Sequence, residues 1–131
     1  LLGGVGSDTY LFTRGDGADV LSDNDATQGN TDRLLFSGVN HDQLWFRAVG
    51  SNNLEVSVIG TSDKVTVSNW NLGTARHVEQ ILASDGLALN DAQVANLVNA
   101  MAAFAPPAAG QTSLSSSYHA ALDTVIAANW Q

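Results

Sequence analysis

Apolar and polar residues alternate through the middle of the chain, which is the pattern of strands that bury one face. Four runs show it, at residues 43–47, 54–58, 64–68 and 77–82, and residues typical of turns separate them. The spacing predicts antiparallel strands. The apolar side chains expected on the buried face are Leu44, Phe46, Leu54, Val56, Val58, Val65, Val67 and Ile81.

Residues 90–131 show the spacing of helices instead. A first helix is predicted to begin at Asn90, which forms a capping-box pattern with Gln93, and to stop before Pro106. A second helix is predicted over 118–130. The apolar stripe of the first helix consists of Val94, Leu97, Val98, Met101 and Phe104. We expect this stripe to pack in the core, because it has no basic rim of the kind that membrane-binding helices carry.

The first part of the chain differs in composition, with short apolar pairs between turns of Gly and Asp. It holds six Asp and no Glu, against only Arg14 and Arg33. Short carboxylates among glycines suit a hard cation that takes oxygen ligands, such as calcium. The composition therefore divides the chain into a first region at 1–36, a middle region at 37–89 and a last region at 90–131.

The chain as a whole is acidic, with 13 acids against 5 bases and a formal net charge of −8 over 131 residues. This charge argues against nucleic acid as a partner, because phosphates need a basic surface. No apolar run approaches the length of a membrane span. Cysteine is absent, so disulfides cannot stabilise the fold, and a bound metal is the obvious replacement outside the cell. The start of the chain reads like the middle of a repeating pattern, so we expect a piece of a longer protein.

A nine-residue motif occurs twice in the first region. Residues 3–11 match the pattern Gly-Gly-x-Gly-x-Asp-x-(large apolar)-x at every fixed position, as calcium-binding β-helix repeats do. Residues 14–22 are a second copy in which Arg14 replaces the first Gly, and Asp8 and Asp19 are 11 residues apart instead of nine. The glycines permit a tight turn with positive φ, and Asp closes it before a short strand. Two such repeats make one coil.

The segments 6–12, 42–47, 53–56 and 128–131 extend the likeness beyond the motif. Together these residues resemble the RTX (repeats-in-toxin, haemolysin-type calcium-binding) proteins, at the last repeat block and its C-terminal flank. The resemblance implies a mainly β fold: the end of a parallel β-roll, capped by antiparallel strands of the middle region, with two short C-terminal helices. It implies Ca²⁺ as the bound ion. The ligands implied are the carboxylates of Asp8 and Asp19 and the carbonyls of Gly4, Gly6, Gly15 and Gly17.

The same resemblance implies a biological role. The parent protein, a toxin or a related secreted protein, would leave the cell through the type I secretion machinery and act outside it. A secretion signal would lie in the last region, and the domain would fold on meeting calcium and cap the upstream RTX repeats of the same chain. We expect no enzyme activity from this chain itself. Two alternatives remain open, namely an adhesion or ligand-binding module of an RTX adhesin and the non-catalytic tail of an RTX lipase or protease.

The segment Asp23–Asp25 is a further candidate for metal binding. It begins like an EF-hand loop, but Gln28 stands where Gly is needed and Leu34 where Glu is needed, so we reject that motif. Asp25 follows Asp8 by 17 residues, close to the roughly 18 of a coil made of two nine-residue repeats. We therefore expect Asp23–Asp25 to complete a calcium site with the first loop.

The other acids and the large aromatics are expected to be structural or solvated. Asp32 is predicted to be a loop acid, and Glu55 and Glu79 are predicted to lie on strands with their carboxylates facing water. The three histidines lack the paired spacing of a zinc site. The side chains of Trp45, Trp70 and Trp130 are predicted to serve packing.

Overall fold

The computed structural model of the chain describes residues 7–22, 31–50, 52–70, 78–111 and 113–131. Within these ranges the chain is mainly β, with two helices, as the sequence predicted. The strands are β1 (Thr9–Thr13), β2 (Ala18–Leu21), β3 (Arg33–Ser37), β4 (Leu44–Val49), β5 (Asn53–Val58), β6 (Lys64–Val67), β7 (Gln80–Leu82) and β8 (Ala88–Asn90). The helices are α1 (Asp91–Met101) and α2 (Ser116–Asn129), and one 3₁₀ turn, η1 (His41–Gln43), precedes β4.

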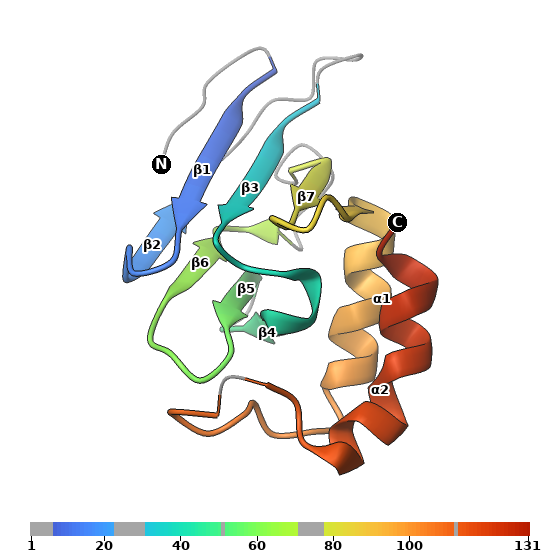
Figure 1. Cartoon of the computed structure of the whole chain (residues 1–131). Helices are drawn as coiled ribbons and strands as arrows, with labels where there is room; N and C mark the ends of the chain where they lie inside the picture. Colours follow the sequence, from blue (N-terminus) through green and yellow to red (C-terminus); the bar gives the residue numbers. More distant parts are fainter. Residues whose placement is uncertain (1–6, 23–30, 51, 71–77, 112) are drawn as a thin grey trace.

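The strands form two four-stranded mixed sheets, in the orders β1-β3-β7-β8 and β2-β6-β5-β4. The chain passes from one sheet to the other, so that β1, β3 and β7 are parallel in the first sheet and β2 and β6 are parallel in the second. The β4–β5 hairpin extends the second sheet with antiparallel strands. Figure 1 shows β1 and β3 side by side on one side of the molecule and the two helices together on the other.

The predicted strands of the middle region form as expected up to β6, and the last one does not. The antiparallel pairing of β4, β5 and β6 is confirmed. Residues 77–82 were expected to join the antiparallel strands of the middle region. This was wrong, because β7 lies in the other sheet, where it is parallel to β3 and antiparallel to β8. The alternation of apolar and polar residues indicates which face of a strand is buried, but it does not specify which strand pairs with it. The connection from β6 to β7 carries the chain across to the first sheet.

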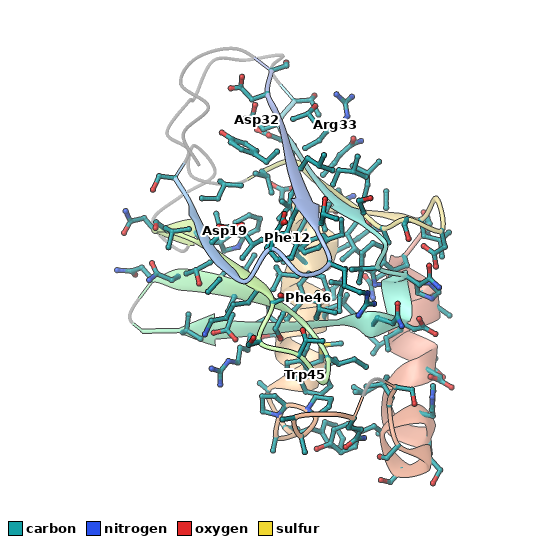
Figure 2. The ribbon with its side chains drawn as sticks, turned by 60° about the vertical axis from the view of Figure 1, so that its left-hand side comes forward. Phe12, Asp19, Asp32, Arg33, Trp45 and Phe46 are labelled. Atoms are coloured by element: carbon teal, nitrogen blue, oxygen red, sulfur yellow. The ribbon has the colours of Figure 1, made fainter. Side chains whose placement is uncertain are left out.

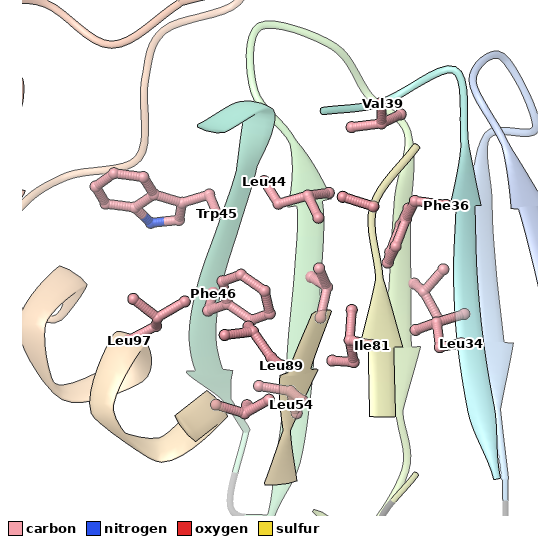
Figure 3. Close-up of a cluster of buried hydrophobic side chains, with 14 of the residues drawn as sticks. Leu34, Phe36, Val39, Leu44, Trp45, Phe46, Leu54, Ile81, Leu89 and Leu97 are labelled. Carbon is pink, nitrogen blue, oxygen red and sulfur yellow. The ribbon is translucent and has the colours of Figure 1, made fainter. Parts of the chain in front are cut away.

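The core lies between the two sheets. Leu34 and Ile81 enter it from the first sheet and Phe46 and Val56 from the second, all fully buried, and Leu97 of α1 closes one end (Figure 3). Every apolar side chain that the strand pattern placed inside is buried. Each such side chain contributes about 1.5–3 kcal/mol by leaving water. The alternation therefore predicted correctly the eight core side chains that it placed inside.

Both helices begin with the caps that their sequences indicate. The Asn90 side chain accepts a hydrogen bond from the Gln93 N–H at 2.8 Å, and the Gln93 side chain accepts one from the Asn90 N–H at 2.9 Å. This confirms the predicted capping box. Helix α2 starts earlier than predicted, because Ser115 caps it. Within the described part of the chain, neither helix is long and apolar enough to cross a membrane.

The C-terminal end of the chain is docked onto the sheets. The backbones of Ala88 and Gln131 exchange two hydrogen bonds of 3.0 Å. The neighbouring Trp130 ring is buried, 6.1 Å from the Phe46 ring and 5.9 Å from the His41 ring. All three tryptophans are at least nine-tenths buried, which confirms that they serve packing.

Candidate metal centre

One acidic residue stands immediately before each parallel strand of the first sheet. Thr9 of β1 pairs with Arg33 of β3, and Arg33 pairs with Gln80 of β7. The residues just before them, Asp8, Asp32 and Glu79, therefore form one row at the N-terminal edge of these strands. We call this row the acidic row.

The carboxylates of the acidic row bond to the backbone of the neighbouring strand. Asp32 Oδ1 accepts a hydrogen bond from the Asp8 N–H at 2.7 Å, and Glu79 Oε2 accepts one from the Asp32 N–H at 2.8 Å. Asp32 is only 1% exposed. A buried carboxylate is costly unless hydrogen bonds or a cation compensate its charge. The row thus ties the coils together and concentrates negative charge at one edge of the sheet.

Asp8 has unused capacity for a cation. Its Oδ2 is buried and has no hydrogen-bond partner among the described residues. A buried carboxylate oxygen without a donor costs free energy, and a calcium ion would remove that cost. Among the described residues, no three His, Asp or Glu side chains are placed to hold a metal. Among the described residues Asp8 therefore offers a single carboxylate, and its further ligands would be backbone oxygens, as the Gly-rich motif implies, or side chains outside the described ranges. The predicted ligands Gly4, Gly6, Asp23 and Asp25 lie outside the described residues.

The expected coil length of 18 residues was wrong. The register of β1 on β3 makes the coil 24 residues long, so the position equivalent to Asp8 belongs to Asp32. The loop acid predicted at position 32 is buried at the loop's end and not solvated. A signal for this existed in the sequence: Asp8-Thr9-Tyr10-Leu11-Phe12 repeats as Asp32-Arg33-Leu34-Leu35-Phe36, and Glu79-Gln80-Ile81-Leu82 repeats its first four positions.

The loop of the second motif copy lies between β1 and β2, and a side chain from a distant part of the sequence holds it. Gly15 and Gly17 have φ of 96° and 81°, as expected for the glycines of this turn. Their N–H groups both donate to the carboxylate of Asp63. The Gly17 carbonyl accepts a hydrogen bond of 2.9 Å from the Lys64 N–H. Asp19 lies in β2, in the second sheet, and Figure 2 shows it apart from Asp32. Calcium binding by this loop stays a prediction.

Two acids that were expected to face water are engaged with protein groups. Glu55 is 8% exposed, and its two oxygens accept hydrogen bonds from the Arg47 guanidinium at 3.3 Å. Strands β4 and β6 flank it on both sides, which explains the burial that alternation alone did not indicate. Glu79 belongs to the acidic row. The sequence therefore missed Asp32, Asp63 and Glu79 as residues that organise the loops.

Residues 53–93 match a known family model. It is that of the haemolysin-type calcium binding protein related domain. The matched segment runs from β5 into α1 and includes Asp63 and Glu79. The match supports an RTX-like relationship and a role connected with calcium. It covers less than half of the chain, and for the first region the likeness rests on the repeated motif.

Proposed function

We propose that this chain is the calcium-binding C-terminal part of a larger secreted RTX protein, and that calcium orders the coil beginning at Asp8. The observation that carries the proposal is the buried Asp8 oxygen, which has no donor within the described ranges and lies on the residue whose N–H bonds to the buried carboxylate of Asp32. The family match of residues 53–93 supports it. The motif of residues 3–11, with its Gly-rich turn and Asp8, supports calcium as the ion.

In this role the Asp8 carboxylate would be a direct ligand, and the carbonyls of Gly4 and Gly6 would be further ones by resemblance to the RTX motif. A bound calcium ion would supply positive charge at Asp8, whose N–H donates to the buried Asp32 carboxylate. Asp23 and Asp25 remain proposed ligands, from a second segment that would complete the site with the first loop. Asp32 holds the Asp8 backbone in place through its hydrogen bond of 2.7 Å.

The wider role rests on the likeness to the last repeat block and flank of adenylate cyclase toxin and related RTX proteins. The middle region would cap the upstream repeats, and the last region would carry the signal for the type I secretion machinery. The chain would have no catalytic activity, and the activity of the parent protein would lie upstream. The expected location is extracellular.

Replacing Asp8 tests the calcium site. We expect Asp8→Asn to weaken calcium binding at least about tenfold, because it removes a charged ligand from a partly buried position, where about 1.4 kcal/mol corresponds to that factor. Asp42→Asn is the matched control, since it removes the same charge from an exposed residue of η1. Calorimetric titration with calcium chloride measures both. Equal affinities of the two variants would show that Asp8 is not a ligand.

A second candidate, the ligand-binding module of an adhesin, is favoured by a cavity of about 370 Å³. Its walls include Arg47, Glu55 and Lys64 on the outer face of the second sheet and the Pro106–Pro107 segment opposite them. This volume lies in the range of small-molecule sites. If the cavity binds saccharides, millimolar glucuronic acid or N-acetylneuraminic acid will shift the NMR signals of Lys64, and Lys64→Ala will abolish the shifts. No shift with either sugar would remove this candidate.

A further inference from the structure

The loop between β1 and β2 is built to receive an anion. The Gly15 N–H donates to Asp63 Oδ2 at 2.8 Å, and the Gly17 N–H donates to Asp63 Oδ1 at 3.0 Å. Asp63 is 7% exposed, so both bonds are shielded from water. Neighbouring backbone N–H groups that converge in this way make a concavity that binds anions. Bonds from N–H groups to a carboxylate are about twice as strong as those between neutral groups.

The same loop has little left to offer a cation. The Gly17 carbonyl already accepts the Lys64 N–H in the ladder between β2 and β6. The positive ends of two N–H dipoles point toward Asp63, and they would oppose a cation there. Asp16 also faces its own turn, because its Oδ2 accepts a hydrogen bond from the Thr13 N–H at 2.8 Å. The Asp8 carboxylate differs from that of Asp16, because one of its oxygens is buried and has no donor among the described residues.

Arg14 is a second residue that holds this loop in place through bonds within the protein. It stands where the motif has its first Gly, and its Nε donates to the Gly38 carbonyl at 2.9 Å while its Nη2 donates to Gln43 Oε1 at 3.1 Å. These bonds tie the loop to the connection between β3 and β4. The position of the loop is thus fixed by protein groups, as it is at Asp63.

We infer that Asp63 takes, in the second Gly–Asp loop, the place that the motif would give to calcium, so that this loop folds without metal. The carboxylate is an internal ligand of the Gly15–Gly17 turn. Its position follows the rule of the acidic row, because Asp63 directly precedes β6 and bonds to Gly17, which directly precedes β2. The inference deepens the proposed function and rests on it only in assigning the calcium dependence to the Asp8 end.

Amide hydrogen exchange of the full chain tests the inference at the loop itself. In excess chelator, we expect the Gly15 and Gly17 amide protons to exchange slowly, and calcium should change their protection less than twofold. Asp63→Asn should remove the protection of both amides, with and without calcium, and lower the midpoint of thermal unfolding by about 5–10 °C. Asp42→Asn again serves as the control of equal charge and should change neither. Protection that appears only when calcium is added would overturn the inference.

Calorimetry with Asp19→Asn is the second test, and it does not depend on the folding of the Asp63 variant. We expect this variant to bind the same number of calcium ions per chain as the unchanged protein, with affinity within about twofold. The loss of one ion per chain would overturn the inference. A protein that binds no calcium at all would contradict the proposed function. The inference about Asp63 would still be tested separately, by whether the Gly15 and Gly17 amides are protected from exchange in chelator.

Discussion

Adding millimolar calcium to the chelated protein will increase the β-sheet signal in circular dichroism, and the same concentration of magnesium will not. The acidic row brings the charges of Asp8 and Asp32 together without a basic side chain bonded to either of their carboxylates in the described structure. A ligand that binds only the folded state stabilises it by RT ln(1 + [L]/Kd), about 2.7 kcal/mol at 100-fold saturation. Calcium should therefore shift the equilibrium toward the state in which the coil at Asp8 is folded.

Magnesium is the discriminating control. The ligands proposed around Asp8 are carboxylate and carbonyl oxygens on a Gly-rich turn, which suits the larger, irregular coordination of calcium. Magnesium demands a tight octahedron and gives up its water reluctantly. The titration should therefore show a transition with calcium only. Identical spectra in chelator and in calcium would contradict calcium-dependent folding, and an equal transition with magnesium would contradict the proposed ligand set.

The gain of signal is expected to be partial. The second loop is held by Asp63, and the described core between the sheets consists of hydrophobic side chains. We therefore expect β2, β4, β5 and β6 to keep their structure in chelator, while the calcium-dependent change is confined to the β1 end of the first sheet. Exchange of backbone amides, followed strand by strand, separates these two parts.

Leu97→Ala will destabilise the protein by about 3–4 kcal/mol, in the range measured for buried leucines. Leu97 is fully buried where α1 covers the sheets (Figure 3), close to the point where the Phe46 N–H donates to the Met101 sulfur of the same helix at 3.3 Å. The loss combines the transfer of the side chain with the cavity that it leaves. Urea unfolding in millimolar calcium measures the change in the free energy of unfolding.

Leu11→Ala is the matched control for this prediction, because the same atoms are removed from a side chain that is 58% exposed on β1. We expect it to cost less than about 1 kcal/mol, since a largely exposed leucine loses little by truncation. Similar losses in the two variants would mean that α1 does not share the core of the sheets. A separate, earlier transition in Leu97→Ala would lead to the same conclusion.

The sequence by itself determined the features that depend on neighbours along the chain. Alternation in 54–58 and 64–68 predicted which apolar side chains enter the core, because successive residues of a strand face opposite sides. The Asn90–Gln93 cap was predicted because both partners lie within one helical turn. Gly15 and Gly17 were predicted to form a turn with positive φ, since only glycine adopts it without cost.

The tertiary structure alone decided the features that depend on which strands meet. The sheet that β7 joins, the coil of 24 residues and the hydrogen bond from the Asp8 N–H to the Asp32 carboxylate follow from strand register, which alternation does not specify. Asp63 reaches the Gly15 and Gly17 amides from 48 and 46 residues away, across the insertion of the β4–β5 hairpin. An acidic residue before a strand looks the same in sequence whether it will receive backbone N–H groups or a cation. Only the folded structure distinguishes the two: two N–H groups point at the Asp63 carboxylate, whereas one Asp8 oxygen has no donor among the residues that the structure describes.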